Sequence, residues 1–130
     1  MVAGVLLFCS AVLFCGAFPN FLFIKGLPFL AWGCALPFLF AIDGKKARQR
    51  CWMGLAWGLM AHAMLVAWLV PVSFGGWAVF AVALALQGVF FALLFPPCET
   101  AFIWKLFWIP SAWVASEWVR TLVLGGFSWS

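Results

Sequence analysis

The most constraining feature of this sequence is a run of 48 residues, from Cys51 to Cys98, that contains no Asp, Glu, Lys or Arg. A helix crosses the hydrocarbon core of a bilayer with about 20 residues, so the run is too long for one crossing and fits two. Residues 71–76, which include Pro71, Gly75 and Gly76, supply the break between them. The run therefore predicts a pair of membrane-spanning helices.

The rest of the chain has the same apolar character. Its 130 residues are 68% hydrophobic and 8% charged, whereas a soluble domain averages about 45–50% apolar and roughly 25% charged residues. This composition excludes the soluble globular, disordered and disulfide-scaffold classes. Uninterrupted apolar runs also lack the alternation of a membrane β-barrel strand. We therefore predict an all-α, multi-pass transmembrane helix bundle with no room for a separate soluble domain.

Charges and turn residues divide the chain into about five helices, which we treat as one membrane-embedded domain covering residues 1–130. We expect helices near residues 2–18, 22–41, 52–70, 76–95 and 103–123. The loop at 43–50 holds four of the seven basic residues, and the positive-inside rule places it in the cytoplasm. Counting back through two helices puts the N-terminus in the cytoplasm as well, and counting forward puts the 71–76 turn outside.

Two polar side chains lie within the predicted helices. His62 follows Gly54 and Gly58 by eight and four residues, so the three share one helix face that a neighbouring helix can approach closely. An ionisable residue inside a membrane is a functional candidate, but the same helix offers no nucleophile or acid beside it. We interpret His62 and Gln87 as packing residues that hydrogen-bond within the helix bundle.

The last predicted helix carries an acid and a base three residues apart, Glu117 and Arg120, on one face. The expected topology places them in the outer half of the membrane or at its outer surface. Two interpretations stay open. The pair is either a structural ion pair or the polar lining of a cavity open to the outer leaflet, where the arginine binds a lipid phosphate.

The cysteines give no sign of a metal or redox site. There are five, an odd number, and no two of them form a CxxC pair. We interpret them as small packing residues. We expect no metal, no cofactor and no nucleic-acid partner.

Four short segments carry a resemblance to a known family. They are, in chain order, Phe18-Pro19, Leu36-Pro37, Trp68 with Phe74-Gly75-Gly76, and Glu117-Trp-Val-Arg120 with Gly126-Phe127-Ser-Trp129. In this order they resemble motifs of bacterial apolipoprotein N-acyltransferases, whose last motif is Glu-x-x-Arg-Gly…Thr-Gly-Phe-Pro-Trp. Thr121, Gly125 and Ser128 depart from that motif.

The resemblance implies an N-terminal membrane domain of such an enzyme, in the bacterial inner membrane. Enzymes of this family transfer an acyl chain from a phospholipid to the N-terminal Cys of a diacylated lipoprotein. Their Glu-Lys-Cys triad lies in a nitrilase-like domain that this chain lacks, so we expect no catalytic residue here and no activity from the chain alone. The implied partners are membrane phospholipid and, through the catalytic half, a lipoprotein substrate.

The resemblance also suggests roles for particular residues. Glu117 and Arg120 are expected to contact lipid head groups or support the outer loops, and Gly126, Phe127 and Trp129 to lie at the outer boundary. An outer turn would be formed by Trp68, Phe74, Gly75 and Gly76. Two alternatives stay open: a non-catalytic scaffold or accessory subunit of another envelope complex, and a small transporter with His62, Gln87 and Glu117 along its path.

Overall fold

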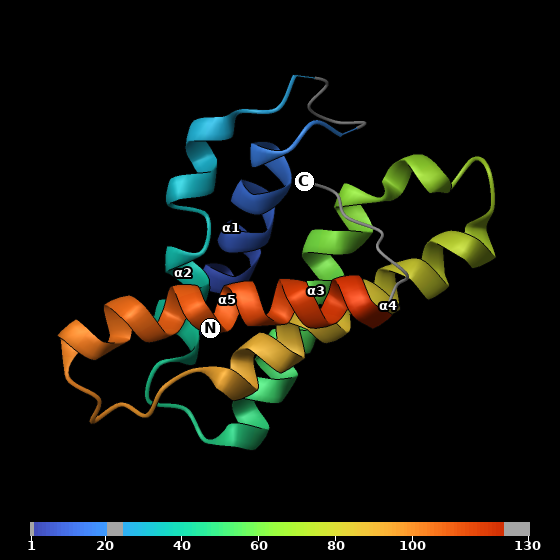
Figure 1. Cartoon of the computed structure of the whole chain (residues 1–130). Helices are drawn as coiled ribbons and strands as arrows, with labels where there is room; N and C mark the ends of the chain where they lie inside the picture. The colour runs from blue at the N-terminus through green and yellow to red at the C-terminus, as the bar shows by residue number, and fades with distance from the viewer. Residues whose placement is uncertain (1, 21–24, 124–130) are drawn as a thin grey trace.

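The computed structural model describes residues 2–20 and 25–123, and this part of the chain is all-α (Figure 1). The predicted fold class is confirmed at that level. The elements are α1 (Val2–Ala17), η1 (Pro28–Trp32), α2 (Leu36–Ile42), α3 (Ala47–Leu65), η2 (Ala67–Leu69), α4 (Phe74–Leu94) and α5 (Phe102–Val123), where η marks a 3-10 helix. The predicted helices 2–18, 76–95 and 103–123 differ from α1, α4 and α5 by at most two residues at either end.

The second predicted helix, 22–41, is wrong as a continuous element. The described part of this segment contains the short η1 and the seven-residue α2, with Gly33 between them. Each of the two begins with a proline at its first or second position, Pro28 and Pro37. A proline lacks the N–H that an inner turn of a helix needs, so two of them divide a run that hydropathy alone would join.

The third helix begins earlier than predicted, at Ala47, so Arg48 and Arg50 of the predicted 43–50 loop lie on α3. It also ends earlier, at Leu65, and η2 follows. Arg50 donates from Nη1 to the backbone oxygen of Phe95, 2.8 Å away, at the end of α4. A cation is favourable there because the C-terminus of a helix carries partial negative charge.

Among the described helices, α4 alone has the length and hydropathy of a membrane-crossing helix. The apolar helix α1 and the segment 28–42 are shorter. One such helix also occurs as the core helix of a soluble protein, so these criteria leave the number of spans as a proposal, taken up below.

The tightest helix pair is the antiparallel hairpin of α3 and α4, which packs through glycines. A Cβ atom on Gly54 would lie 2.9 Å from Cβ of Ala92, and one on Gly58 would lie 2.6 Å from the backbone oxygen of Ala85. Real Cβ atoms do not approach other atoms this closely. The small-residue face expected on the third helix is therefore the face that α4 covers.

An aromatic and hydroxyl contact joins α1 and α2 to this hairpin. The ring of Trp57, on α3, stacks on Phe38 of α2 with centroids 4.8 Å apart. Its Nε1 donates to Oγ of Ser10, on α1, at 3.0 Å, and that hydroxyl donates to the backbone oxygen of Cys34 at 2.6 Å. The irregular backbone before α2 thereby gains a partner inside the protein, as buried carbonyl groups require.

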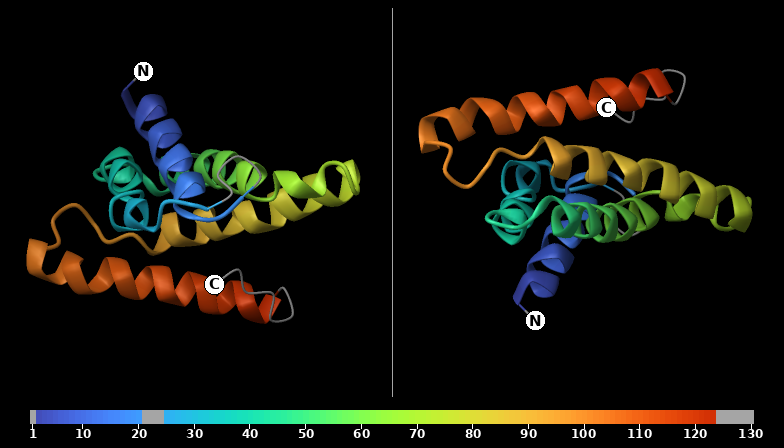
Figure 2. Two further views of the ribbon diagram at one scale, coloured as in Figure 1. Left: turned by 90° about the horizontal axis from the view of Figure 1, so that it is seen from above. Right: turned by 90° about the horizontal axis from the view of Figure 1, so that it is seen from below.

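Helix α5 forms an outer layer. Figure 2 shows it alongside α4 in both views, running in the opposite direction, while α1 projects at a steep angle to the pair. Ala112 and Ser116 are its only buried residues. Near its start, Nε1 of Trp108 donates to the backbone oxygen of Leu94 at 2.8 Å, and Nζ of Lys105 lies 3.4 Å from Oδ1 of Asp43. These polar contacts attach one end of α5.

The glycine contact predicts a steric effect on stability. We expect Gly58→Ala to lower the free energy of unfolding in detergent by about 1–3 kcal/mol, the usual cost of overpacking. Gly4→Ala is the matched control, because nothing lies within 4 Å of a Cβ at Gly4 and alanine favours a helix. Equal stability of the two variants, measured by denaturant titration, would contradict the proposed contact.

Candidate functional site

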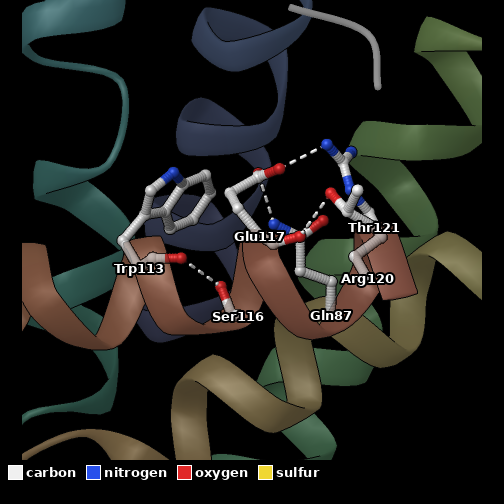
Figure 3. A network of polar contacts seen from close by, with 6 residues as sticks. All are labelled: Gln87, Trp113, Ser116, Glu117, Arg120 and Thr121. Atoms are coloured by element: carbon white, nitrogen blue, oxygen red, sulfur yellow. Dashed lines mark hydrogen bonds and ion pairs between the residues drawn. The ribbon is translucent and has the colours of Figure 1, made fainter. Parts of the chain in front are cut away.

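The candidate site centres on Glu117, which is held from two directions (Figure 3). Nε2 of Gln87, on α4, donates to Oε1 of Glu117 at 2.5 Å. Arg120, one turn further along α5, donates through Nη2 to the other carboxylate oxygen and forms an ion pair with it. The predicted acid and base, Glu117 and Arg120, are therefore paired with each other. Gln87 of α4 also contacts Glu117 of α5.

Hydroxyl groups on α5 are satisfied by their own helix. Oγ of Ser116 donates to the backbone oxygen of Trp113 at 2.7 Å, and Oγ1 of Thr121 donates to that of Glu117 at 2.9 Å. Such bonds to residues three or four positions earlier let Ser and Thr lie in apolar surroundings. They leave the carboxylate of Glu117 to the side chains of Gln87 and Arg120.

The two side chains of the ion pair are both partly shielded from the surroundings of the protein. The side chain of Arg120 is 12% exposed and that of Glu117 is 33% exposed. A charge in such surroundings is costly unless it is paired. In the described part of the chain, Nε of Arg120 and Oε1 of Gln87 are buried and lack a hydrogen-bond partner. The cluster is therefore electrically balanced but not saturated with hydrogen bonds.

A cavity of about 760 Å³ lies beside this cluster, between α1, α3 and α5. Its polar lining consists of His62, Glu117, Arg120 and Thr121. Its remaining lining is apolar and consists of Phe14, Phe18, Pro19, Leu65, Trp113, Val114 and Trp118. The predicted ionisable residues of two different helices thus line one largely apolar space.

His62 lines this cavity while its residue surface is only 2% exposed. Nδ1 lies 2.8 Å from the backbone oxygen of Gly58, one turn earlier in α3. Its ring lies 5.9 Å from that of Phe14 and 6.2 Å from that of Trp57, between centroids. This histidine, for which a packing role was expected, therefore also lies at the wall of the cavity, where it can contact a ligand.

Gln87 lines a different space, a groove of about 350 Å³ between α4 and α5. Arg120 and Ser116 line the same groove, and most of its other residues are apolar. Arg120 therefore borders both the groove and the larger cavity. Gln87 lines the groove and Glu117 lines the cavity, so their hydrogen bond joins the two linings.

The residues expected in an outer turn lie on either side of the connection between η2 and α4, away from the cavity. Trp68 belongs to η2, and Phe74, Gly75 and Gly76 form the first turn of α4, which Ser73 caps by accepting from the Gly76 N–H at 3.1 Å. None of these residues lines the cavity. Gly126, Phe127 and Trp129 lie outside the described residues, so their expected positions stay predictions.

The described lining of the cavity supplies groups that can bind a ligand. Within residues 2–20 and 25–123, no group of three His, Cys, Asp or Glu side chains could hold a metal ion. The cysteines do not contribute to the cavity lining, and Cys15 and Cys34 are buried elsewhere. The lining instead supplies an apolar wall, a hydrogen-bonding imidazole and a balanced ion pair.

The part of the cavity lining that comes from α1 and the turn after it was not predicted from the sequence. Phe14, Phe18 and Pro19 line the cavity, yet in the sequence they belong to an ordinary apolar helix and the turn after it. Phe18-Pro19 is one of the segments that carry the family resemblance, but no local signal places these three residues at a cavity, because that role depends on how α1 crosses α3 and α5.

Fold and site together define a largely apolar helical domain whose few internal polar groups gather at one cavity. Comparison with known proteins identifies its family. A sequence model described as "Apolipoprotein N-acyltransferase N-terminal domain" matches residues 10–130. The chain is also 30% identical, over 140 aligned positions, to an apolipoprotein N-acyltransferase of Vibrio vulnificus (strain CMCP6). No solved structure matches.

The chain therefore belongs to the apolipoprotein N-acyltransferase family and corresponds to its N-terminal domain. The alignment with the Vibrio protein covers 92% of this chain and 26% of that relative. The chain thus spans about a quarter of the relative's length, and the resemblance deduced from short motifs is confirmed at the level of the family.

The ion pair predicts a non-additive response to charge removal. Glu117→Gln leaves the nearly buried Arg120 side chain without its counter-ion, so we expect it to destabilise the chain by at least about 1 kcal/mol more than Glu117→Gln/Arg120→Gln does. The measurement is denaturant unfolding in detergent. Asp43→Asn, at the more exposed pair with Lys105, is the control and should change stability by less than about 1 kcal/mol. A double variant that is no more stable than Glu117→Gln would contradict the proposed pairing.

Proposed function

We propose that this chain is the N-terminal membrane domain of an enzyme that transfers an acyl chain from a phospholipid to the N-terminal Cys of diacylated lipoproteins. The observation that carries the proposal is the family match across residues 10–130. The domain would hold the catalytic part at the membrane and shape the space that acyl chains enter. Because its cavity lining holds no cysteine, we propose that the chain alone is inactive.

We further propose that the domain crosses the bacterial inner membrane several times, with its N-terminus in the cytoplasm. Large apolar side chains on the outside of the molecule support this placement. Val79, Phe107 and Trp118 are 72%, 67% and 66% exposed, and such side chains are common across the surface of α4 and α5. Water is a poor solvent for such a surface, whereas lipid is a good one.

Within this placement, we propose that the cavity between α1, α3 and α5 receives an acyl chain. Its aromatic and aliphatic wall suits a hydrocarbon, and its described polar residues come from α3 and from the C-terminal half of α5. Glu117 and Arg120 would support α5 against α4 and lie near the lipid head group. Their ion pair favours this supporting role over capture of a free phosphate by the arginine.

The topology can be tested with reporter fusions in bacterial cells. A periplasm-active reporter joined after residue 72 should be active, and one joined after residue 46 should be inactive, because the basic residues near 43–50 stay in the cytoplasm. A cytoplasm-active reporter at the same two positions provides the control and should give the opposite pattern. The same activity at both positions would contradict the proposal.

The acyltransferase role can be tested in a chimera. The chain would replace the matching N-terminal part of the Vibrio enzyme in cells depleted of their own N-acyltransferase. We expect mass spectrometry of a lipoprotein N-terminus to show restored N-acylation. Arg120→Ala should lower it at least severalfold because Glu117 loses its counter-ion. Asp43→Asn, which alters the ion pair with Lys105 near the start of α5, should leave the N-acylation unchanged. Full N-acylation by the Arg120→Ala chimera would remove support for this role.

A further inference from the structure

We infer that the cavity between α1, α3 and α5 binds a neutral, single-chain amphiphile with a hydroxyl head group, and that His62 accepts a hydrogen bond from that hydroxyl. This inference rests on the membrane placement proposed above, which supplies amphiphiles as the surrounding molecules. It goes beyond acyl transfer, because it concerns which head group the cavity selects.

The shape and lining of the cavity indicate an amphiphile. Its volume of about 760 Å³ falls within the roughly 300–1,000 Å³ range of small-molecule pockets. Four aromatic side chains of the lining can contact a hydrocarbon chain: Phe14, Phe18, Trp113 and Trp118. The ring of Phe14 lies 5.1 Å from that of Phe18 and 6.2 Å from that of Trp113, between centroids. Among the residues that the structure describes, the polar members of the lining come from α3 and α5, which favours a ligand with one polar end.

The tautomer of His62 indicates what that polar end must donate. The backbone oxygen of Gly58 can only accept, so the hydrogen of a neutral imidazole lies on Nδ1, 2.8 Å from it. Nε2 then carries a lone pair and is the ring atom that remains for a ligand. In a membrane interior, an acceptor without a donor is unfavourable, so a ligand that offers an O–H group gains a hydrogen bond there.

The charges around the cavity indicate that the head group is neutral. Glu117 and Arg120 form an ion pair, and Gln87 donates to the second carboxylate oxygen. A phosphate would have to compete with Glu117 for the guanidinium, and an ammonium would have to compete with Arg120 for the carboxylate. A hydroxyl disturbs neither contact, and its oxygen can accept from a remaining N–H of Arg120.

The first measurement compares ligands on the full chain in nanodiscs. A photoreactive monoacylglycerol is displaced by a monoacylglycerol, by the methyl ester of the same fatty acid, or by the lysophosphatidic acid with the same chain. We expect the monoacylglycerol to bind about three- to fifteenfold more tightly than the methyl ester. This is the affinity ratio that corresponds to the free energy of one hydrogen bond in a membrane. Cross-linked peptides should come from α1 and α5. Equal binding of the methyl ester, or tighter binding of the lysophosphatidic acid, would overturn the inference.

The second measurement tests His62 directly. His62→Asn keeps an N–H near the position of Nδ1, and so its bond to Gly58, but has no acceptor near the position of Nε2. We expect it to abolish the preference for monoacylglycerol over methyl ester without changing the affinity for the ester. The longer His62→Gln places an amide oxygen near the position of Nε2 and should restore the preference. Retention of the preference in His62→Asn, or its loss in both variants, would overturn the inference.

Trp77→Phe is the control for the histidine variants. Trp77→Phe removes an indole N–H that bonds the backbone oxygen of Ala63 at 3.1 Å, outside the cavity lining, and should leave the preference unchanged. If His62→Asn does not fold, the ligand comparison on the unaltered chain decides the matter. None of these assays requires acyl transfer, so failure here is distinguishable from failure of the chimera.

Discussion

The close approach of α3 and α4 is the contact on which the rest of the structure depends. Gly54 and Gly58 bring the two backbones together, and every other layer attaches to one member of this pair. Helices α1 and α2 pack on α3, while α5 packs on α4. The cavity lies between α1 and α5, so its width is set through the α3–α4 contact. A larger residue at either glycine would shift both walls.

Several polar side chains of this apolar chain bind partners inside the protein. Arg50 binds the backbone oxygen of Phe95 and lies over its ring, 5.3 Å from the centroid. Ser10 links Trp57 to the backbone oxygen of Cys34. Where lipid replaces water, such internal pairing is the available way to satisfy a polar atom. The irregular backbone between η1 and α2 is tolerated for this reason, because it packs against α1.

The sequence predicted the elements whose signals are local and continuous. Helices α4 and α5 follow long apolar runs bounded by proline or glycine, and their predicted ends differ little from the structure. The prediction of one continuous helix over 22–41 was wrong because it rested on hydropathy alone. Pro28 and Pro37 lack the backbone N–H that the interior of a helix requires, so the segment is divided. Glu117 and Arg120 share a helix turn, so their pairing was one of the predicted possibilities. The contact with Gln87 spans 30 residues and has no local signal.

The attachment of α5 and the character of the cavity depend on the same residue. Glu117 joins α5 to α4 through Gln87, and it also lines the cavity with His62 and Arg120. Apolar packing also holds α5, because Ala112 belongs to the hydrophobic core and the ring of Trp113 lies 5.3 Å from that of Phe91, between centroids. A ligand that binds only when α5 is docked stabilises the docked state by mass action. If the cavity binds such a ligand, its occupation therefore favours the docked position of α5, and a neutral head group leaves the ion pair intact.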